Sequence, residues 1–254
     1  MFYQTFLLFL FSPIFVISLH CNSCRPISVD YLVTNDTVPE FSQCTVINAT
    51  RCLVTVNWNK NMNKTTILVD AIHEPTPQNI SQDWLTGMVF MEALRDVESP
   101  FLSHALAYSC LSSVQCNNQD ILKRILSSLT IEDQFRQELY PLIKIVTPFD
   151  PKSAACFNFN NFTGHCPSED LNACQRCQSA ISKFPSSFDE VCATCPRESP
   201  NENVAVRSKV FSLNDQNVFA DHVQLDCQLK GCNSMDNTNR IYEASTIKYD
   251  FTKN

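Results

Sequence analysis

Cysteines are the residues of this 254-residue sequence with the most chemical potential, and there are fourteen of them. Their thiolates can bind zinc, exchange disulfides or form structural bridges. The run Cys174-x2-Cys177-x14-Cys192-x2-Cys195 comes close to a four-cysteine zinc ribbon. In an intracellular chain this run favours zinc, and in a secreted chain it favours disulfides. Redox catalysis is disfavoured because no C-x-x-C here sits in an obvious strand-to-helix turn that would lower a thiol pKa.

The N-terminal residues decide between these compartments. Residues 1–20 contain no charged side chain, and the apolar run from Phe6 to Ile17 is shorter than the about 20 residues of a membrane span. Val16 and Ser18 are small residues before a cleavage point, so residues 1–18 are predicted to be a signal peptide. An uncleaved anchor is the competing interpretation, which a proline inside the run disfavours. We therefore expect a secreted, extracellular protein.

Five N-x-[ST] sequons agree with secretion, since each glycosylated asparagine needs a surface position. They are Asn35, Asn48, Asn63, Asn79 and Asn161. Residues 241–254 carry charges and no apolar tail, so no GPI anchor is expected. No other segment has the 18 consecutive apolar residues that indicate a membrane span.

Other chemistry has little support. Only three glycines are present and they lie far apart, which removes the nucleotide-binding loops and the hydrolase nucleophile elbow. A net charge of -7 argues against nucleic acid as a partner. The five histidines lie in unrelated contexts, with His104 read as a packed or surface residue, and the neighbouring Glu132 and Asp133 point to different helix faces. We expect no enzyme, no cofactor and no metal.

The order of the cysteines indicates a repeat. The first set is Cys21, Cys24, Cys44, Cys52, Cys110 and Cys116. The second set is Cys174, Cys177, Cys192, Cys195, Cys227 and Cys232. Each set opens with C-x-x-C and closes with a short-spaced pair followed by Asn117 or Asn233, while Cys156 and Cys166 are left over. Duplication explains this matched order better than the arbitrary division of a cysteine-rich chain.

Strand patterns must position these cysteines. Two β-branched runs, Leu53–Trp58 and Thr65–Ala71, are joined by a polar stretch and predict a hairpin. Val204–Leu213 and Val218–Leu225 predict a second hairpin. The segment Trp84–Leu94 fits either a short helix or a buried strand, because its periodicity does not decide.

Between the sets the pattern changes to helical. Asn118 is a plausible N-cap for an apolar face between Ile121 and Leu129, and a second helix is predicted from Thr130 to Tyr140. We interpret the apolar face as packed on its own domain rather than as a lipid or partner site. Prolines 148 and 151 mark a boundary. The predicted organisation is a disulfide-rich module at 19–117, a helical linker at 118–151, a second module at 152–234 and a tail at 235–254.

The start Leu19-x-Cys21-x2-Cys24, the hairpin after Cys52 and the closing Cys110-x5-Cys116-Asn117 resemble the Ly6/uPAR family of three-finger domains. The resemblance is weaker in the second set, where Cys227 to Asn233 matches best. It implies a mainly β, small disulfide-rich fold of two three-finger-like modules joined by a helical segment, α+β overall.

The resemblance also implies a pairing of the cysteines, one of the fifteen that six cysteines allow. In the first set it joins Cys21 to Cys52, Cys24 to Cys44 and Cys110 to Cys116. In the second set it joins Cys174 to Cys195, Cys177 to Cys192 and Cys227 to Cys232, with Cys156 to Cys166 as an extra bridge.

A saposin-like, lipid-binding module is the alternative, because its cysteines follow a similar order, although such modules are helical between them and the runs here have strand character. The favoured function is a binding or interaction role toward an unknown extracellular protein or receptor. If the resemblance holds, the contact surface includes the hairpin tip Asn59–Lys64, where Asn63 is a sequon.

Overall fold

The computed structural model describes residues 19–73, 82–94, 97–111, 113–145, 156–161, 166, 174, 176–185, 187–196 and 202–253. The predicted signal peptide at 1–18 and the sequon at Asn79 lie outside these residues. The fold is mainly β and disulfide-rich, with 49% strand and 15% helix. Among the described residues no helix is both long enough and apolar enough to cross a membrane.

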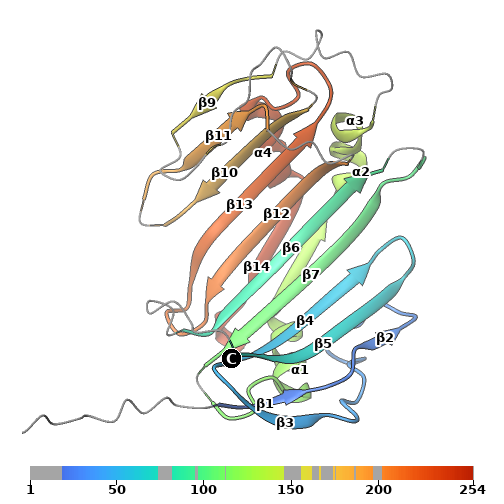
Figure 1. Cartoon of the computed structure of the whole chain (residues 1–254), viewed down its shortest axis with the longest axis vertical. Helices are drawn as coiled ribbons and strands as arrows, with labels where there is room; N and C mark the ends of the chain where they lie inside the picture. Colours follow the sequence, from blue (N-terminus) through green and yellow to red (C-terminus); the bar gives the residue numbers. More distant parts are fainter. Residues whose placement is uncertain are drawn as a thin grey trace, which may run out of the picture.

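One antiparallel sheet of ten strands runs through both cysteine sets (Figure 1). Its first half has the order β2 (Ile27–Val29), β5 (Lys64–Ile72), β4 (Arg51–Asn59), β7 (Phe101–Cys110) and β6 (Trp84–Ala93). Its second half continues with β12 (Asn203–Ser212), β13 (Asn217–Cys227), β10 (Cys177–Lys183), β11 (Glu190–Thr194) and β9 (Phe159–Asn160). The halves join where β6 pairs with β12 along their whole length, from Ala93 opposite Asn203 to Trp84 opposite Ser212. The cysteine sets therefore share one sheet instead of meeting only through a helical linker.

Both predicted hairpins are confirmed. Strands β4 and β5 pair from Arg51 opposite Ile72 to Asn59 opposite Lys64, and β12 pairs with β13. Trp84–Ala93 is the strand β6, whose period of two was hidden because Met88 and Phe90, on the uncovered face, are also apolar.

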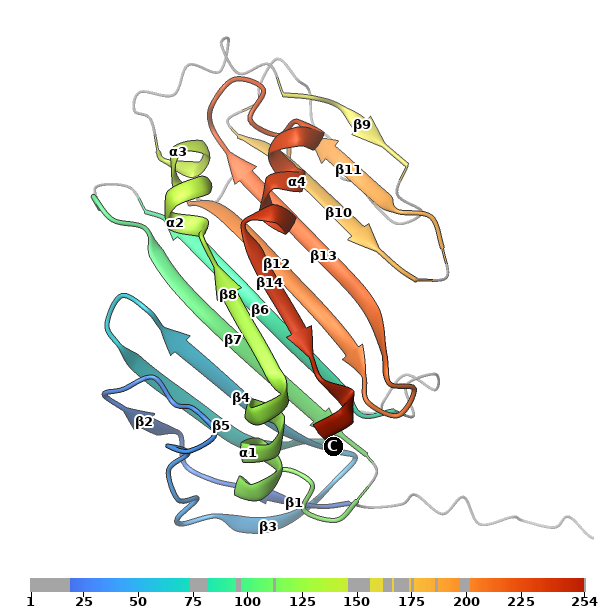
Figure 2. The same ribbon diagram turned by 180° about the vertical axis from the view of Figure 1, so that it is seen from behind.

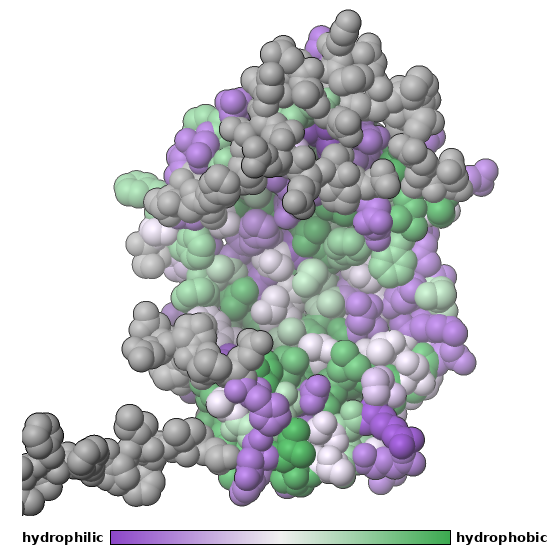
Figure 3. All heavy atoms as spheres, in the orientation of Figure 1, coloured by the Kyte–Doolittle hydropathy of each residue, from purple (hydrophilic) through white to green (hydrophobic). Residues whose placement is uncertain are grey.

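A second layer covers one face of the sheet (Figure 2). It contains α1 (Gln119–Ser128), β8 (Leu129–Asp133), α2 (Phe135–Glu138), α3 (Tyr140–Ile143), α4 (Met235–Glu243), β14 (Ser245–Tyr249) and a 3-10 turn (Phe251–Lys253). A small sheet of β1 (Leu19–Ser23) and β3 (Thr45–Ala49) lies at the lower end in Figure 1. In Figure 3 green and white residues, apolar or weakly polar, lie across the middle of the sheet's other face.

Two linker and tail predictions are wrong. The helix predicted from Thr130 is the strand β8, because β-branched residues in this stretch pair with β14 and the helix begins only at Phe135. Residues 235–253, expected as a tail, form α4, β14 and the 3-10 turn, and Ile247 in β14 is buried. The first linker helix is correct, since the side chain of Asn118 caps α1 by accepting from the backbone N–H of Ile121 at 2.9 Å.

The two halves repeat the same elements in the same order. Strands β4, β5, β6 and β7 followed by α1 and β8 correspond to β10, β11, β12 and β13 followed by α4 and β14. In the sheet the two series run outward from the β6–β12 junction in mirrored order. On the covered face β8 pairs with β14, and the central pair is Ile131 opposite Ile247. This arrangement is that of a two-fold pseudo-symmetric pair within one chain.

Candidate functional site

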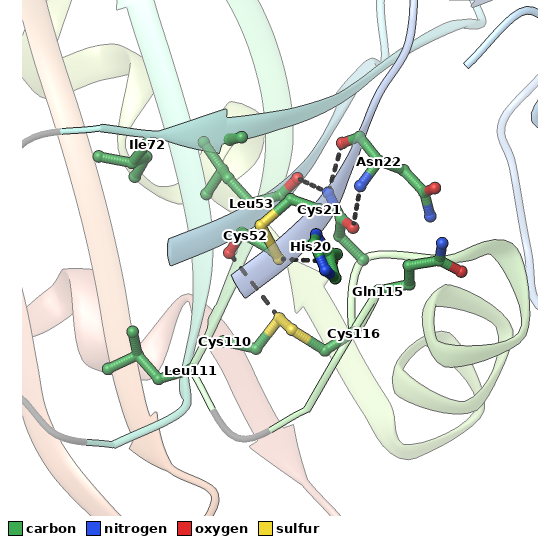
Figure 4. Close-up of a disulfide and its surroundings, with 12 residues drawn as sticks. His20, Cys21, Asn22, Cys52, Leu53, Ile72, Cys110, Leu111, Gln115 and Cys116 are labelled. Carbon is green, nitrogen blue, oxygen red and sulfur yellow. Dashed lines mark hydrogen bonds between the residues drawn. A yellow bond between two sulfur atoms is a disulfide. The ribbon is translucent and has the colours of Figure 1, made fainter. Parts of the chain in front are cut away.

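Seven disulfides bind all fourteen cysteines. In the first set the bonds are Cys21–Cys52, Cys24–Cys44 and Cys110–Cys116, the same pairs that the family resemblance implies. Figure 4 shows Cys110–Cys116 beside Cys21–Cys52, where β4 and β7 meet the end of the chain segment that leads to α1. The second set contains two further bonds of the implied pairing, Cys174–Cys195 and Cys227–Cys232.

The remaining two bonds differ from the implied pairing. The structure joins Cys156 to Cys177 and Cys166 to Cys192, so the pairs Cys177–Cys192 and Cys156–Cys166 are wrong. The reason is the strand register: Cys192 lies opposite Ala180, three residues along β10 from Cys177. At about 3.4 Å per residue these two cysteines are roughly 10 Å apart, beyond the about 7 Å that a disulfide tolerates.

The four cysteines of the zinc-ribbon run are all bonded through these bridges. Cys174 and Cys195 bind each other, while Cys177 and Cys192 bind the two cysteines that the sequence left over. Sulfurs in disulfides are not thiolates, and metal binding needs the thiolate.

Two buried asparagines, Asn117 and Asn233, directly follow the last cysteine of each set. We call them the knot asparagines. The side chain of Asn117 accepts from the backbone N–H of Asn22 at 2.9 Å and donates to the carbonyls of Asn22, Leu53 and Asp70. Its amide thereby ties together β1, β4 and β5, and it is 0% exposed.

Asn233 repeats this network in the second half. It accepts from the backbone N–H of Phe157 at 2.9 Å and donates to the carbonyls of Phe157 and Gln178 at 3.0 Å. Phe157 follows Cys156 as Asn22 follows Cys21, and Gln178 follows Cys177 as Leu53 follows Cys52. The second repeat therefore begins at Cys156, not at Cys174.

The described sequons lie at or near the surface. Asn48, Asn63 and Asn161 are exposed and Asn35 is half-buried. Asn63 stands in the turn of the β4–β5 hairpin, which is the exposed tip Asn59–Lys64.

A pocket of about 400 Å³ opens beside this tip, between the loop that follows β2, the ends of β4 and β7, and the overlying α1 and β8. Its apolar wall consists of Leu32, Val33, Trp58, Leu126, Leu129 and Ile131. Its polar wall consists of Thr34, Asn35, Lys60 and His104. Four of the apolar side chains, Leu32, Leu126, Leu129 and Ile131, are only half-buried. We call this space the first-half pocket.

A buried histidine and carboxylate lie at this pocket. His104 of β7 is 5% exposed, and its Nε2 lies 2.6 Å from Oδ2 of Asp133, at the end of β8. Burial alone raises the pKa of a carboxyl group, but hydrogen bonds from His104 and the N–H of Phe135, with the charges of His104 and Lys60, hold the pKa of Asp133 below its usual value. Asp133 is therefore ionised and accepts a hydrogen from Nε2. The other nitrogen, Nδ1, has no hydrogen-bond partner in the described part of the chain.

The same place in the second half has different residues. Trp58 lies opposite His104 in the β4–β7 pairing, and Lys183 lies opposite Asp221 in the β10–β13 pairing. Each of the four stands six residues from the cysteine at the end of its strand. His104 thus corresponds to Asp221 and Trp58 to Lys183.

Ion pairs and a tyrosine fill this second place. Arg207 binds Asp221 through both carboxylate oxygens at 3.1 and 2.9 Å, and its guanidinium lies 5.0 Å from the centre of the Tyr242 ring. The Tyr242 hydroxyl donates to the backbone carbonyl of Asp221 at 3.1 Å. Tyr242 stands nine residues after its knot asparagine, as Leu126 does in the first half. Leu126 is shorter than Tyr242, and it borders the open first-half pocket where Tyr242 fills the corresponding place of the second half.

The sequence predicted His104 to be a packed or surface residue, and it did not indicate Trp58, Lys60 and Asp133 as its neighbours in a site. Comparing the two cysteine sets position by position could have exposed them, but only with the repeat begun at Cys156. The arrangement offers a small amphipathic cavity with one buried polar group and one rim cation, which suits binding of a small molecule.

No protein-family model, no curated protein and no solved structure matches this chain.

Proposed function

We propose that this is a secreted, N-glycosylated protein that acts outside the cell by binding, and that the first-half pocket is its ligand site. Seven disulfides and a mainly β fold are compatible with an extracellular protein. The expectations of a signal peptide and of glycans rest on the sequence.

One observation carries the proposal. The pocket keeps four half-buried apolar side chains over a buried His104–Asp133 pair, while ion pairs and Tyr242 fill the corresponding place of the second half. Closing such a space is evidently possible in this fold, and the open version leaves apolar surface that a ligand can cover.

Binding is favoured over catalysis because a reaction needs a nucleophile or a positioned water as well as a base. Thr34 is the hydroxyl residue of the described lining, and its Oγ1 lies 3.1 Å from that of Thr37 instead of facing His104 as a partner. The Ly6/uPAR resemblance and a receptor partner remain hypotheses, with the tip Asn59–Lys64 as the contact for the latter.

The test uses the second half as a template for closing the pocket. In a Trp84→Phe background, Trp58 is the one remaining tryptophan of the chain and reports on the pocket by energy transfer to N-phenyl-1-naphthylamine, a neutral apolar fluorophore. We expect the probe to bind, and Leu126→Tyr to weaken binding at least about tenfold, since it fills the space as Tyr242 does.

The control is Ser127→Tyr, which adds the same ring one residue along on the exposed side of α1. Equal probe binding by the two tyrosine variants, with both folded by circular dichroism, contradicts the assignment of the pocket.

A further inference from the structure

Resting on the proposed function, we infer that the ligand of the first-half pocket is a single-chain amphiphile with an anionic head group, held by Lys60 at the rim with its apolar chain among Leu126, Leu129 and Ile131.

The charge of the lining points to an anionic head. Lys60 is exposed and is the lining residue with a permanent charge, and neither Asp nor Glu belongs to the described lining. In the described part of the chain its ammonium group has no ion-pair partner, whereas Lys64, at the other end of the same turn, binds Asp30 at 3.1 Å. A cation at the mouth of an apolar space, with no ion pair among the described residues, favours an anion at this point.

The nearby carboxylate does not oppose this. Asp133 is about nine-tenths buried and forms no part of the lining. Its Oδ2 accepts from His104 and its Oδ1 accepts from the N–H of Phe135 at 2.9 Å, so its negative charge is held by groups of the protein.

The apolar wall favours a small apolar body, and a single alkyl chain is one that fits. Leu126, Leu129 and Ile131 come from α1 and β8 on one side, and Leu32 comes from the loop after β2 on the other. A volume of about 400 Å³ suits one chain of a small lipid or a compact ring system, and is at the small end for ligand pockets. A fatty carboxylate combines this body with a head for Lys60.

Displacement of N-phenyl-1-naphthylamine tests the head group. Dodecanoate and dodecanol share one apolar chain and differ in charge. The acid is added below its micelle concentration and the alcohol below its solubility limit in water. We expect dodecanoate to displace the probe at a concentration at least about tenfold lower than dodecanol does. Lys60→Met keeps the length of the side chain without its charge and should abolish this preference.

Lys64→Met is the matched control, because it removes a charge from the same turn but one that is already paired; it should keep the preference for dodecanoate. Equal displacement by the acid and the alcohol in the wild type, or an unchanged preference in Lys60→Met, overturns the anionic ligand and leaves the pocket standing. Failure of the wild type to bind the probe at all overturns the pocket, and this inference with it.

Discussion

Asn117 and Asn233 show how much a single side chain holds in place. Each is 0% exposed and each bonds the backbone on both sides of the disulfide that opens its repeat. The primary amide is the neutral side-chain group that offers two donors and an acceptor at this length. Aspartate lacks the donors and would bring a charge into a buried place.

Removal of the first knot amide should therefore be costly. Asn117→Ala leaves a backbone N–H and up to three carbonyls without their partner, and we expect the free energy of unfolding to fall by about 3 kcal/mol. Guanidinium denaturation under oxidising conditions measures this. The control is Asn22→Ala, since Asn22 meets Asn117 through its backbone, and it should change the unfolding free energy by less than about 0.5 kcal/mol. Equal losses in the two variants contradict the role of the knot amide.

Residues of this kind are only partly visible in a sequence. The Cys-Asn endings were recognised as a repeated pair, but the function of the asparagines depends on backbone groups 47 to 95 positions away. The same limit explains the wrong pairing of Cys177: its C-x-x-C spacing resembles that of Cys21 and Cys24, while the strand register that excludes Cys192 is set by β10 and β11 together.

At the scale of elements, the local sequence pattern was sufficient to predict those elements that depend on neighbouring residues. The hairpins and the N-cap at Asn118 depend on neighbouring residues and were predicted correctly. Strand β8 was not, because its partner β14 lies more than a hundred residues away in the chain. Pairing with β14 outweighs the local pattern that predicted a helix from Thr130.

The β8–β14 ribbon lies close against the sheet at Gly87 of β6. A Cβ added there would lie 2.7 Å from Cγ2 of Ile247 and 3.6 Å from Cδ1 of Ile131. We expect Gly87→Ala to lower the free energy of unfolding by about 1–3 kcal/mol, because the ribbon must shift. Thr86→Ala, on the opposite face of the same strand, is the control and should have a much smaller effect.

A double-mutant cycle separates this close approach from a general intolerance of β6. Ile247→Ala removes the atom that the new methyl group meets, so the double variant should lose less stability than the sum of the two single changes, by about 1 kcal/mol. Strict additivity of the two losses is the result that contradicts a direct contact.

At the scale of the whole molecule, the two halves join into one sheet, but they differ at the place of the first-half pocket. The β6–β12 junction and the β8–β14 ribbon bring equivalent elements together around Ile131 and Ile247. Composition and cysteine order predicted a secreted protein with two sets of cysteines. They did not predict the register in which β6 and β12 pair, because no local pattern specifies it. In the second half the equivalent place is filled by the ion pair of Arg207 and Asp221. Comparison of the folded halves shows that the first half has a pocket there.

The sequon residue Asn35 is part of the wall of this pocket, so a glycan attached there would add a second level of control. A glycan on Asn35 is expected to stand at the mouth, and it should slow the entry of a ligand without changing the wall that holds it. In protein secreted by cells that glycosylate, Asn35→Gln should raise the association rate of N-phenyl-1-naphthylamine several-fold in stopped-flow fluorescence. Asn48→Gln removes a glycan from the exposed strand β3, away from the lining, and should leave the rate unchanged. Mass spectrometry first tests whether both asparagines carry glycans in the parent protein. If they do, equal rates in the parent and in Asn35→Gln contradict a glycan that obstructs the mouth.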